Sequence, residues 1–259
     1  MLNHILELYL KVFIIVYMEK QHPIITIPLA HRGLHDDKRD ENSISAFENA
    51  ITHKYGIELD VHLMKDGNIA VIHDSNLKRV TGFDVEINTL TKKDLKNYPL
   101  LISKSYIPLL KEVLDIVDGK VPILIELKVE NDFNPDFALK VLENLDSYPY
   151  KKNIALQSFN PYAVKYLKTH QDVYPIGQLA SDVLPGQSKF VHFMFKHLFI
   201  LHLSKPDFLN YEVAYIKKRR IARLRRRGLA IIAWTIDDEN KKTLAAKYAD
   251  NIIFEKITL

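Results

Sequence analysis

Cysteine is absent from this chain of 259 residues. Disulfide bonds, thiolate nucleophiles and cysteine-ligated zinc sites are therefore excluded. A chain without disulfides fits a reducing compartment, and we expect a cytoplasmic protein. Linkers, low-complexity tracts and clear internal repeats are also lacking. The length therefore favours one large domain, and single α/β barrels commonly have about this size.

Long hydrophobic runs are lacking as well. An apolar run near the N-terminus covers only residues 12–18, and Glu7 and Lys11 interrupt the apolar residues before it. The segment is too short and too charged for a membrane span. It also has neither the basic start nor the small-residue cleavage site of a secretory signal. We expect residues 1–22 to form an apolar extension packed on a barrel domain of residues 23–259.

Charge of one sign is only slightly in excess, because the formal net charge is +4. The excess is local, since eight lysines and arginines lie within residues 217–227 on one predicted helix. Two explanations stay open, a solvated outer helix face and a weak peripheral contact with a membrane of anionic lipids. Nucleic acid is not an expected partner, because no interleaved aromatic residues or groove-reading motif accompanies these charges.

Short β-rich segments alternate with segments of helical periodicity. Between most of the β-rich segments, apolar residues recur with the period of a helix, as Ile44, Phe47 and Ile51 do. Eight strands in strict alternation with helices predict a (β/α)8 TIM barrel of the α/β class rather than an open sheet. The runs that predict strands are residues 24–29, 57–62, 122–127, 154–157, 174–179, 207–209, 229–234 and 251–254.

A β-hairpin interrupts the alternation after the second predicted strand. Asp66-Gly67 stands between two apolar runs, which is a strong signal for a two-residue turn. If these two residues form the turn, Lys65 pairs with Asn68 and Asp60 lies opposite His73. A small insert of about residues 74–107 follows. We expect it to form part of the wall around the active site, because barrel chemistry is found at the C-terminal ends of the strands.

Polar clusters stand at four predicted strand ends. In a strand, residues two apart point to the same face, so Glu58 and Asp60 project together. Glu126 and Lys128 do the same. Three carboxylates inside a barrel repel one another unless a cation joins them, and oxygen ligands favour Mg²⁺, Ca²⁺ or Mn²⁺. The alternative is a buried Glu126–Lys128 ion pair with further charges on the rim. The clusters are His31-Arg32-Gly33, Glu58-Leu59-Asp60, His73-Asp74 and Glu126-Leu127-Lys128.

Two histidines stand out by position. His31 follows an apolar strand, and the hairpin count places His73 beside the carboxylates. Two histidines that flank a metal-bound phosphate can act as general base and general acid. Arg32 can donate two hydrogen bonds to phosphate oxygens, and Lys128 can add a point charge. His62 shares a face with Asp60 but lies farther along the hairpin, so we expect it to matter less.

In their order, these clusters resemble the signature of the glycerophosphodiester phosphodiesterase family. The resemblance runs from about residue 29 to about residue 255, and only the ordered set is specific, since each piece alone is common. The sequence departs from the family pattern at Asp40, at Asp237 and in the last predicted strand, which reads Asn251 to Phe254 before Glu255. The matching residues are His31-Arg32-Gly33, Glu41-Asn42-Ser43, Gly56 to Val61, Lys65-Asp66-Gly67, Val71-Ile72-His73-Asp74, Arg79, Glu126-Leu127-Lys128, Gln157-Ser158-Phe159 and Ala233-Trp234-Thr235.

The resemblance implies a phosphoric diester hydrolase. The substrate would be a small glycerophosphodiester, such as glycerophosphocholine or glycerophosphoethanolamine, and the products glycerol 3-phosphate and an alcohol. It also implies one divalent cation, Mg²⁺ or Ca²⁺, with Mn²⁺ as a further option. Two explanations of Trp234 are equally good: a residue that lines the substrate pocket and a core residue at a strand end. The implied roles are catalysis by His31 and His73, metal binding by Glu58, Asp60 and Glu126, and substrate binding by Arg32, Glu41, Lys128 and Trp234.

Two other functions stay open. The basic residues at 217–227 and the apolar segment 190–203 favour a related barrel phosphodiesterase that acts on lysophospholipids or phosphoinositides. A non-catalytic phosphate-ligand binder is the alternative outside the enzymes, although binding alone needs neither histidine. The alcohol headgroup, the physiological metal and the oligomeric state are left open by the sequence.

Overall fold

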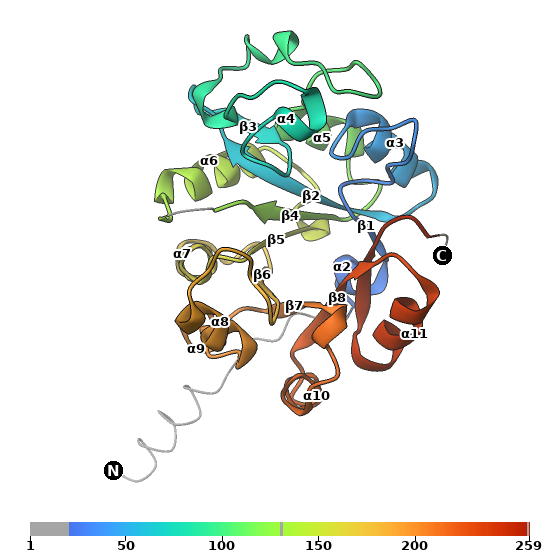
Figure 1. The fold of residues 1–259 in the computed structure, drawn as a ribbon, viewed down its shortest axis with the longest axis vertical. Helices are drawn as coiled ribbons and strands as arrows, with labels where there is room; N and C mark the ends of the chain where they lie inside the picture. Colours follow the sequence, from blue (N-terminus) through green and yellow to red (C-terminus); the bar gives the residue numbers. More distant parts are fainter. Residues whose placement is uncertain (1–20, 130–131, 258) are drawn as a thin grey trace.

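A computed structural model describes residues 21–129, 132–257 and 259 of the chain. Eight parallel strands form a closed ring in the order β1-β9-β8-β7-β6-β5-β4-β2, and a β1–β2 pairing closes it (Figure 1). The predicted (β/α)8 barrel is therefore confirmed. The parallel strands are β1 (Leu29–Ala30), β2 (Gly56–Leu63), β4 (Ile123–Leu127), β5 (Ile154–Ser158), β6 (Ile176–Ala180), β7 (Phe208–Glu212), β8 (Ala230–Ile236) and β9 (Asn251–Phe254).

Helices surround the ring on its outer side (Figure 1). The α-helices are α2 (Pro23–Thr26), α3 (Ile44–Thr52), α4 (Lys78–Thr81), α5 (Leu110–Val117), α6 (Pro135–Asp146), α7 (Pro161–His170), α8 (Lys189–Lys196), α9 (Ile200–Ser204), α10 (Arg219–Arg226) and α11 (Glu239–Tyr248). Short 3-10 turns are η1 (Ile87–Thr89), η2 (Leu95–Asn97), η3 (Lys151–Asn153) and η4 (Val213–Tyr215).

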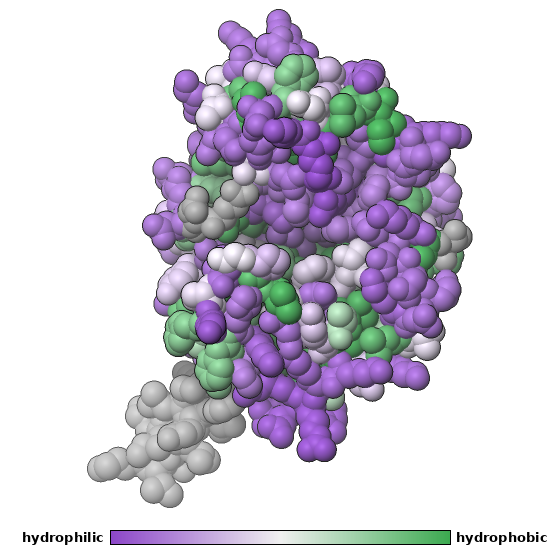
Figure 2. All heavy atoms as spheres, in the orientation of Figure 1, coloured by the Kyte–Doolittle hydropathy of each residue, from purple (hydrophilic) through white to green (hydrophobic). Residues whose placement is uncertain are grey.

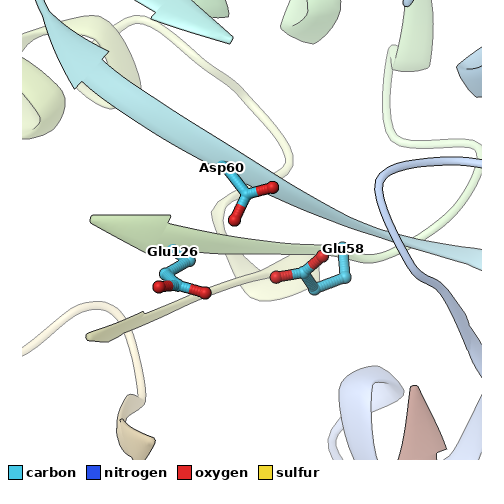
Figure 3. Close-up of side chains that lie close together, drawn as sticks. All are labelled: Glu58, Asp60 and Glu126. Carbon is cyan, nitrogen blue, oxygen red and sulfur yellow. The ribbon is translucent and has the colours of Figure 1, made fainter. Parts of the chain in front are cut away.

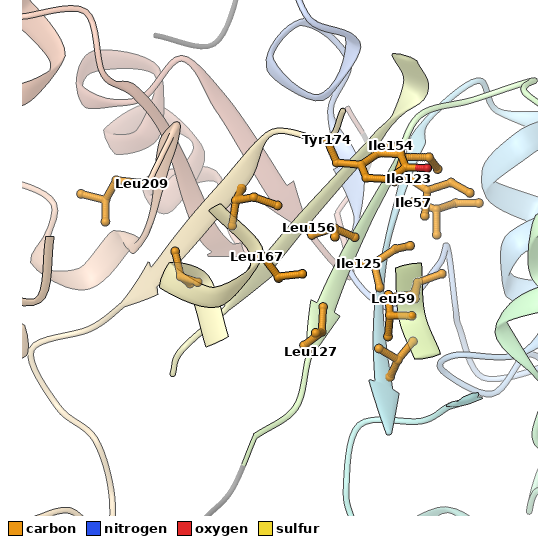
Figure 4. Packing of buried hydrophobic residues seen from close by; sticks show 14 of the residues in the cluster. Ile57, Leu59, Ile123, Ile125, Leu127, Ile154, Leu156, Leu167, Tyr174 and Leu209 are labelled. Atoms are coloured by element: carbon orange, nitrogen blue, oxygen red, sulfur yellow. The ribbon is translucent and has the colours of Figure 1, made fainter. Parts of the chain in front are cut away.

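The main core lies between the strands and the helices. Alternate strand residues such as Leu59, Ile125 and Leu156 are fully buried there, and Leu167 of α7 packs against this layer (Figure 4). Because successive side chains of a strand point to opposite faces, the intervening residues face the inside of the barrel. Apolar residues fill the N-terminal end of the interior, whereas polar residues occupy its C-terminal end. The N-terminal end of the barrel interior is therefore a packed apolar cluster, which we call the floor, and the C-terminal end is a polar site.

The prediction of a strand at residues 24–29 is wrong for most of its length. Pro23 begins the helical turn α2, and the side chain of His22 accepts a hydrogen bond from the Ile24 backbone N–H. Proline fits the first turn of a helix, where its missing N–H costs nothing. Only Leu29 and Ala30 enter the ring. Ile24 is fully buried with the apolar floor of the barrel, so the run is apolar because it plugs that end.

Tight packing in the floor depends on Gly177 of β6. A Cβ atom at this position would lie 2.2 Å from Cε2 of Phe208. Phe208 is fully buried in the floor cluster, and its ring occupies the space that a side chain on β6 would need. The glycine is therefore required by close approach and not by its backbone angles.

The hairpin forms, but its register differs from the prediction by one residue. β2 pairs with β3 (Ile69–Val71) through His62 and Ala70, which puts Asp60 opposite Ile72 and not opposite His73. Three residues, not two, form the loop, and Gly67 takes a positive φ of 80° at its end. A three-residue hairpin loop of this kind has a turn followed by a residue in the left-handed conformation. The sequence Asp-Gly fits this loop as well as the two-residue loop. β1 pairs only with the first two residues of β2, so the C-terminal half of β2 is free on that side and pairs there with β3.

The insert after the hairpin folds on a small core of its own. Leu77 at the start of α4, Ile87 of η1 and Leu95 of η2 are buried in one cluster with Ile72. This core adjoins the hairpin, so the insert stands beside the C-terminal end of β2.

The basic cluster at 217–227 lies largely on α10. Val213 and Ile216 before the helix and Ile221 within it are buried, and most of the basic side chains are exposed. Lys218 forms an ion pair with Asp182, and Arg225 with Asp250. The predicted extension at 1–22 lies almost wholly outside the described residues. Among the residues described, no helix has the length and apolar character needed to cross a membrane.

Candidate active site

Three carboxylates meet inside the C-terminal end of the barrel. Glu58 and Asp60 project from β2, and Glu126 projects from β4 directly beside Asp60 in the parallel register. One oxygen of each lies within 4.8 Å of the others, and the side chains face a common space (Figure 3). All three residues are at most 6% exposed. The i, i+2 spacing and the adjacency of the strands produce this cluster, as the sequence predicted.

Two cations offset part of this negative charge. The Lys128 ammonium lies 2.9 Å from Oε1 of Glu126 and 3.5 Å from Oδ1 of Asp60. The Nε atom of Arg32 lies 3.5 Å from Oδ2 of Asp60, and its backbone N–H donates to Glu58. The Glu126–Lys128 ion pair therefore exists, but it is part of a larger cluster. With all groups ionised, three carboxylates face two cations.

The carboxyl groups titrate differently because their neighbours differ. Burial and the charges of Asp60 and Glu126 raise the pKa of Glu58 well above its usual range. Burial also raises the pKa of Glu126, although Lys128 opposes it. For Asp60, burial is outweighed by Lys128, His73 and Arg32, which together hold its pKa well below its usual range. Three buried carboxylates crowded into one space in this way fit a site for a divalent cation.

Amide side chains behind the cluster fix its carboxylates. Asn42 donates to Oδ2 of Asp60 at 2.9 Å. Gln157 of β5 donates to Glu58 at 3.2 Å, and Asn210 of β7 donates to Gln157 at 2.7 Å. These supporting contacts were not predicted. Asn42 and Gln157 stood in the family-like motifs without a role, and nothing in the sequence singled out Asn210.

His31 stands at the rim, directly after β1. Its Nδ1 atom lies 2.8 Å from Oε2 of Glu255, which follows β9. The contact with His31, and that with His35, hold the pKa of Glu255 far below its usual range. The carboxylate thus occupies Nδ1 and leaves Nε2 as the ring nitrogen available for chemistry. Glu255 was not predicted as a site residue.

His73 is held in a similar way by its neighbour in sequence. Its Nδ1 atom lies 2.6 Å from Oδ1 of Asp74, and the other oxygen of Asp74 accepts from Arg79 at 2.5 Å. Burial lowers the pKa of His73. Although burial opposes the shift, the hydrogen bonds from Arg79 and His73 lower the pKa of Asp74 to about 2.

Glu41 joins this network to Arg32. Its two oxygens accept from Arg79 at 2.7 and 2.8 Å and from Arg32 at 2.8 Å. Burial opposes the shift, but the two guanidinium groups lower the pKa of Glu41 to about 2. Both oxygens are therefore engaged by arginines, so the carboxylate positions Arg32. His62 is turned elsewhere, since its Nε2 atom lies 2.9 Å from the backbone oxygen of His73.

A cavity of about 820 Å³ is lined in part by His73, Lys128 and Trp234. The Trp234 ring packs edge-on against Phe159 at 5.6 Å. Within the described residues its buried Nε1 atom has no hydrogen-bond partner. The indole therefore combines an apolar face with a donor that a ligand oxygen can engage. All the predicted site residues thus lie around one end of the barrel.

Comparison with known proteins decides the family. Residues 31–257 match the glycerophosphoryl diester phosphodiesterase family. The chain belongs to this family. A glycerophosphodiester phosphodiesterase of Caldanaerobacter subterraneus subsp. tengcongensis is 28% identical over 238 residues, which cover 88% of this chain and 93% of that protein. Family membership makes the chain a phosphoric diester hydrolase of the glycerophosphodiester phosphodiesterase class.

Other family relatives differ in extent of similarity. The human lysophospholipase D GDPD1 is 34% identical over 140 residues, which cover 48% of this chain and 43% of that protein. The crystal structure of a glycerophosphodiester phosphodiesterase from Thermotoga maritima shares 27% identity, with a TM-score of 0.69 and coverage of 88% and 94%. A phosphodiesterase of Oleispira antarctica, solved in complex with the product sn-glycerol-3-phosphate, shares the fold at 21% identity, with a TM-score of 0.75 and coverage of 88% and 93%.

Proposed function

We propose that this enzyme hydrolyses glycerophosphodiesters to glycerol 3-phosphate and an alcohol, with one divalent cation and two histidines. The observation that carries this proposal is the arrangement of His31 and His73 around the buried carboxylates. Each ring is held at Nδ1 by a carboxylate. Both histidines lie close enough to Asp60 to help lower the pKa of its carboxyl group. The product bound to the Oleispira antarctica protein supports the glycerol phosphate part of the substrate.

Glu58, Asp60 and Glu126 would hold the cation. When bound, a divalent cation withdraws charge from phosphate oxygens and so favours attack at phosphorus. Mg²⁺ and Ca²⁺ are the ions we propose, because the donors are all carboxylate oxygens. Arg32 and Lys128 point their charges at the same space, where they stabilise the additional negative charge of the transition state. Glu41 keeps the Arg32 guanidinium in place.

The histidines would move the protons. One accepts a proton from the attacking water as the new P–O bond forms. The other donates a proton to the alcohol oxygen as its bond to phosphorus breaks. Because Nδ1 of each ring faces a carboxylate, Nε2 is the nitrogen that exchanges the proton. The buried Trp234 N–H would supply a donor for a substrate hydroxyl.

The test is product analysis with glycerophosphocholine. Protein dialysed against a chelator should release no glycerol 3-phosphate, and added Mg²⁺ or Ca²⁺ should restore release. Calorimetric titration with each ion reports binding independently of turnover, and Glu58→Gln should weaken it. Full turnover by a metal-free sample would refute the role of the cation.

Histidine variants test the proton transfers. His31→Ala and His73→Ala should each lower kcat by about 10²–10⁴-fold, the usual contribution of a positioned acid or base. His53→Ala is the matched control, because His53 is exposed at the end of α3. A variant at position 31 or 73 that keeps normal kcat with an intact circular dichroism spectrum removes that histidine from the mechanism.

A further inference from the structure

The loop after β1 carries a second histidine, His35, on the C-terminal side of His31. Hydrogen bonds tie this loop to α3. The Leu34 backbone N–H donates to the Ala46 carbonyl at 3.0 Å, and the Asn49 side chain donates to the Leu34 carbonyl at 2.8 Å. The helix therefore sets the place of the loop, and with it the place of both imidazoles.

Both imidazoles face one carboxylate oxygen across the seam between β1 and β9. Oε2 of Glu255 lies 2.8 Å from Nδ1 of His31 and 3.6 Å from Nε2 of His35. The Glu255 backbone N–H donates to the Ile236 carbonyl at 3.0 Å, which fixes this end of the contact. The other carboxylate oxygen lies 3.3 Å from Nζ of Lys256, whose side chain is 69% exposed. Water screens the lysine contact, so the two histidines are the closely held neighbours of the carboxylate.

The Nε2 atom of His35 stands out among the polar groups of the protein. Hydrophilic residues cover most of the face in Figure 2, where water can satisfy them. Nε2 of His35 is instead buried, and within the described residues it has no hydrogen-bond partner. By contrast, Nδ1 of the exposed His53 and Nδ1 of the exposed His170 each lie 2.9 Å from a backbone oxygen.

A buried ring nitrogen without a partner is costly, so this atom needs an acceptor. The carboxylate of Glu255 is the acceptor within reach. Its separation of 3.6 Å from His35 is slightly too long for a hydrogen bond. A small rotation of the ring or of the carboxylate closes this gap. His35 then donates through Nε2–H to the same oxygen that faces His31.

Proton transfer at His31 gives this second donor a purpose. In the proposed reaction the His31 ring is charged in one part of the cycle and neutral in the other. A carboxylate holds a charged ring more strongly than a neutral one. A donor that stays on Glu255 in both states keeps the carboxylate in place when its contact with His31 weakens.

We propose that His35 is a positioning residue, which holds the Glu255 carboxylate and through it keeps the His31 ring oriented for proton transfer. The proposal rests on the proposed function, because that function assigns the proton transfer to His31. His35 itself contacts neither the substrate nor the cation in this scheme. Glu255 accepts from Nε2–H of His35 and from Nδ1–H of His31, and Nε2 of His31 stays free to exchange the proton.

Three substitutions at position 35 separate the donor from the shape of the side chain. His35→Phe keeps a ring without a donor, His35→Gln keeps a donor at nearly the same reach, and His35→Asn has the same amide on a shorter side chain. His35→Phe and His35→Asn should lower kcat for glycerophosphocholine about three- to tenfold with little change in KM, the effect of one hydrogen bond. His35→Gln should recover most of the loss. Lys256→Gln is the matched control and should keep normal kcat, because Lys256 contacts the same carboxylate from the solvent side.

A double-variant cycle tests whether His35 acts through Glu255. Glu255→Ala removes the carboxylate that His35 holds. In this protein the further change His35→Phe should therefore leave kcat where Glu255→Ala alone puts it. A merely structural effect of position 35 would instead multiply with the loss caused by Glu255→Ala.

Nitrogen NMR of the histidine rings reports the contact without turnover. When His31 is neutral, its ¹⁵N shifts in the native protein should show the proton on Nδ1. His35→Phe should give a mixture of the two ring tautomers. The His31 signals are identified by their loss in His31→Ala.

The outcomes separate this proposal from the proposed function. A fall in kcat at constant KM, recovered in His35→Gln and absent without Glu255, supports the role of His35. Normal kcat in His35→Phe and His35→Asn, a rise in KM alone, or losses that multiply in the double variant overturn it. If His35→Phe does not fold, equal kcat in His35→Gln and His35→Asn overturns it as well. Absence of turnover by the native protein with Mg²⁺ or Ca²⁺ contradicts the proposed function, and a His31 tautomer that is the same in all variants then overturns the role of His35 independently.

Discussion

The Nδ1 atom of His31 and a carboxylate oxygen of Glu255 lie 2.8 Å apart, although 224 positions separate the two residues in the chain. The contact orients the imidazole and places a carboxylate beside the ring nitrogen opposite the one that exchanges the proton. We expect Glu255→Gln to lower kcat about ten- to a hundredfold with little change in KM, because the amide keeps the shape but loses the charge. Glu255→Asp should restore part of the loss. Steady-state kinetics with glycerophosphocholine measure both.

Glu239→Gln is the control, since this glutamate is exposed on α11 and pairs at the surface with Lys242. An unchanged kcat in Glu255→Gln would mean that Glu255 supports the barrel seam and not the reaction.

Arg32→Lys tests whether the planar guanidinium matters. Glu41 holds one end of the group, and Nε faces Asp60 at 3.5 Å. Lysine keeps the charge but cannot donate two parallel hydrogen bonds. Loss of one charged hydrogen bond costs about 1.5–3 kcal/mol, so kcat/KM should fall roughly ten- to a hundredfold. Arg39→Lys, at a half-buried arginine of the same loop that pairs with Asp36, should leave kcat/KM unchanged. Equal kinetics for both variants would exclude a bidentate role for Arg32.

Acid stability should depend on Glu41. The two arginines lower the pKa of its carboxyl group from 4.5 to about 2 in the folded protein. A depressed pKa stabilises the fold above the unfolded value and loses that effect as the pH falls through the folded value. The difference corresponds to at most about 3 kcal/mol. The free energy of unfolding of Glu41→Gln should therefore lie below that of the native protein near neutral pH, and this gap should narrow between about pH 4.5 and about pH 2.

Urea unfolding over a pH series measures the gap. Asp84→Asn is a comparison variant, because Asp84 is exposed and pairs with Lys78. A gap for Glu41→Gln that stays constant down to about pH 2 would contradict a depressed pKa.

Gly177→Ala should destabilise the barrel floor. The new methyl group would meet the ring of Phe208 at 2.2 Å, and both groups sit among packed strands. Overpacking of this kind costs about 1–3 kcal/mol. Phe208→Leu in the same chain should recover part of the loss, since the smaller side chain frees the space. Thermal unfolding of the single and double variants measures this coupling. If the losses of stability in the two single variants simply add in the double variant, the Phe208 ring does not clash with the new methyl group, and β6 has shifted to make room for it.

The carboxylate cluster was predictable because it depends on local rules. Glu58 and Asp60 share a face by the two-residue period of a strand, and Glu126 follows from adjacency of consecutive parallel strands. The barrel itself follows from eightfold alternation. These features need only the order of elements along the chain.

Features that depend on closure around the ring were out of reach. Asn210 reaches Gln157 from β7, and Glu255 reaches His31 across the seam between β9 and β1. No spacing in the sequence encodes those distances. The register of the hairpin was missed for a different reason, since Asp-Gly fits both a two-residue and a three-residue loop. The turn at Pro23 was missed because a short apolar run has no decisive period.

The barrel seam also links activity to the order of synthesis. β1 pairs with β9, and the His31 backbone N–H donates to the Phe254 carbonyl. His31 is synthesised 224 positions before the Glu255 carboxylate that meets its ring. A ribosome-bound chain that lacks residues 251–255 therefore has an open barrel and an unsupported histidine. We therefore expect the His31 ring to lack its carboxylate partner, and hydrolysis to be reduced, until β9 has been made and the ring of strands has closed.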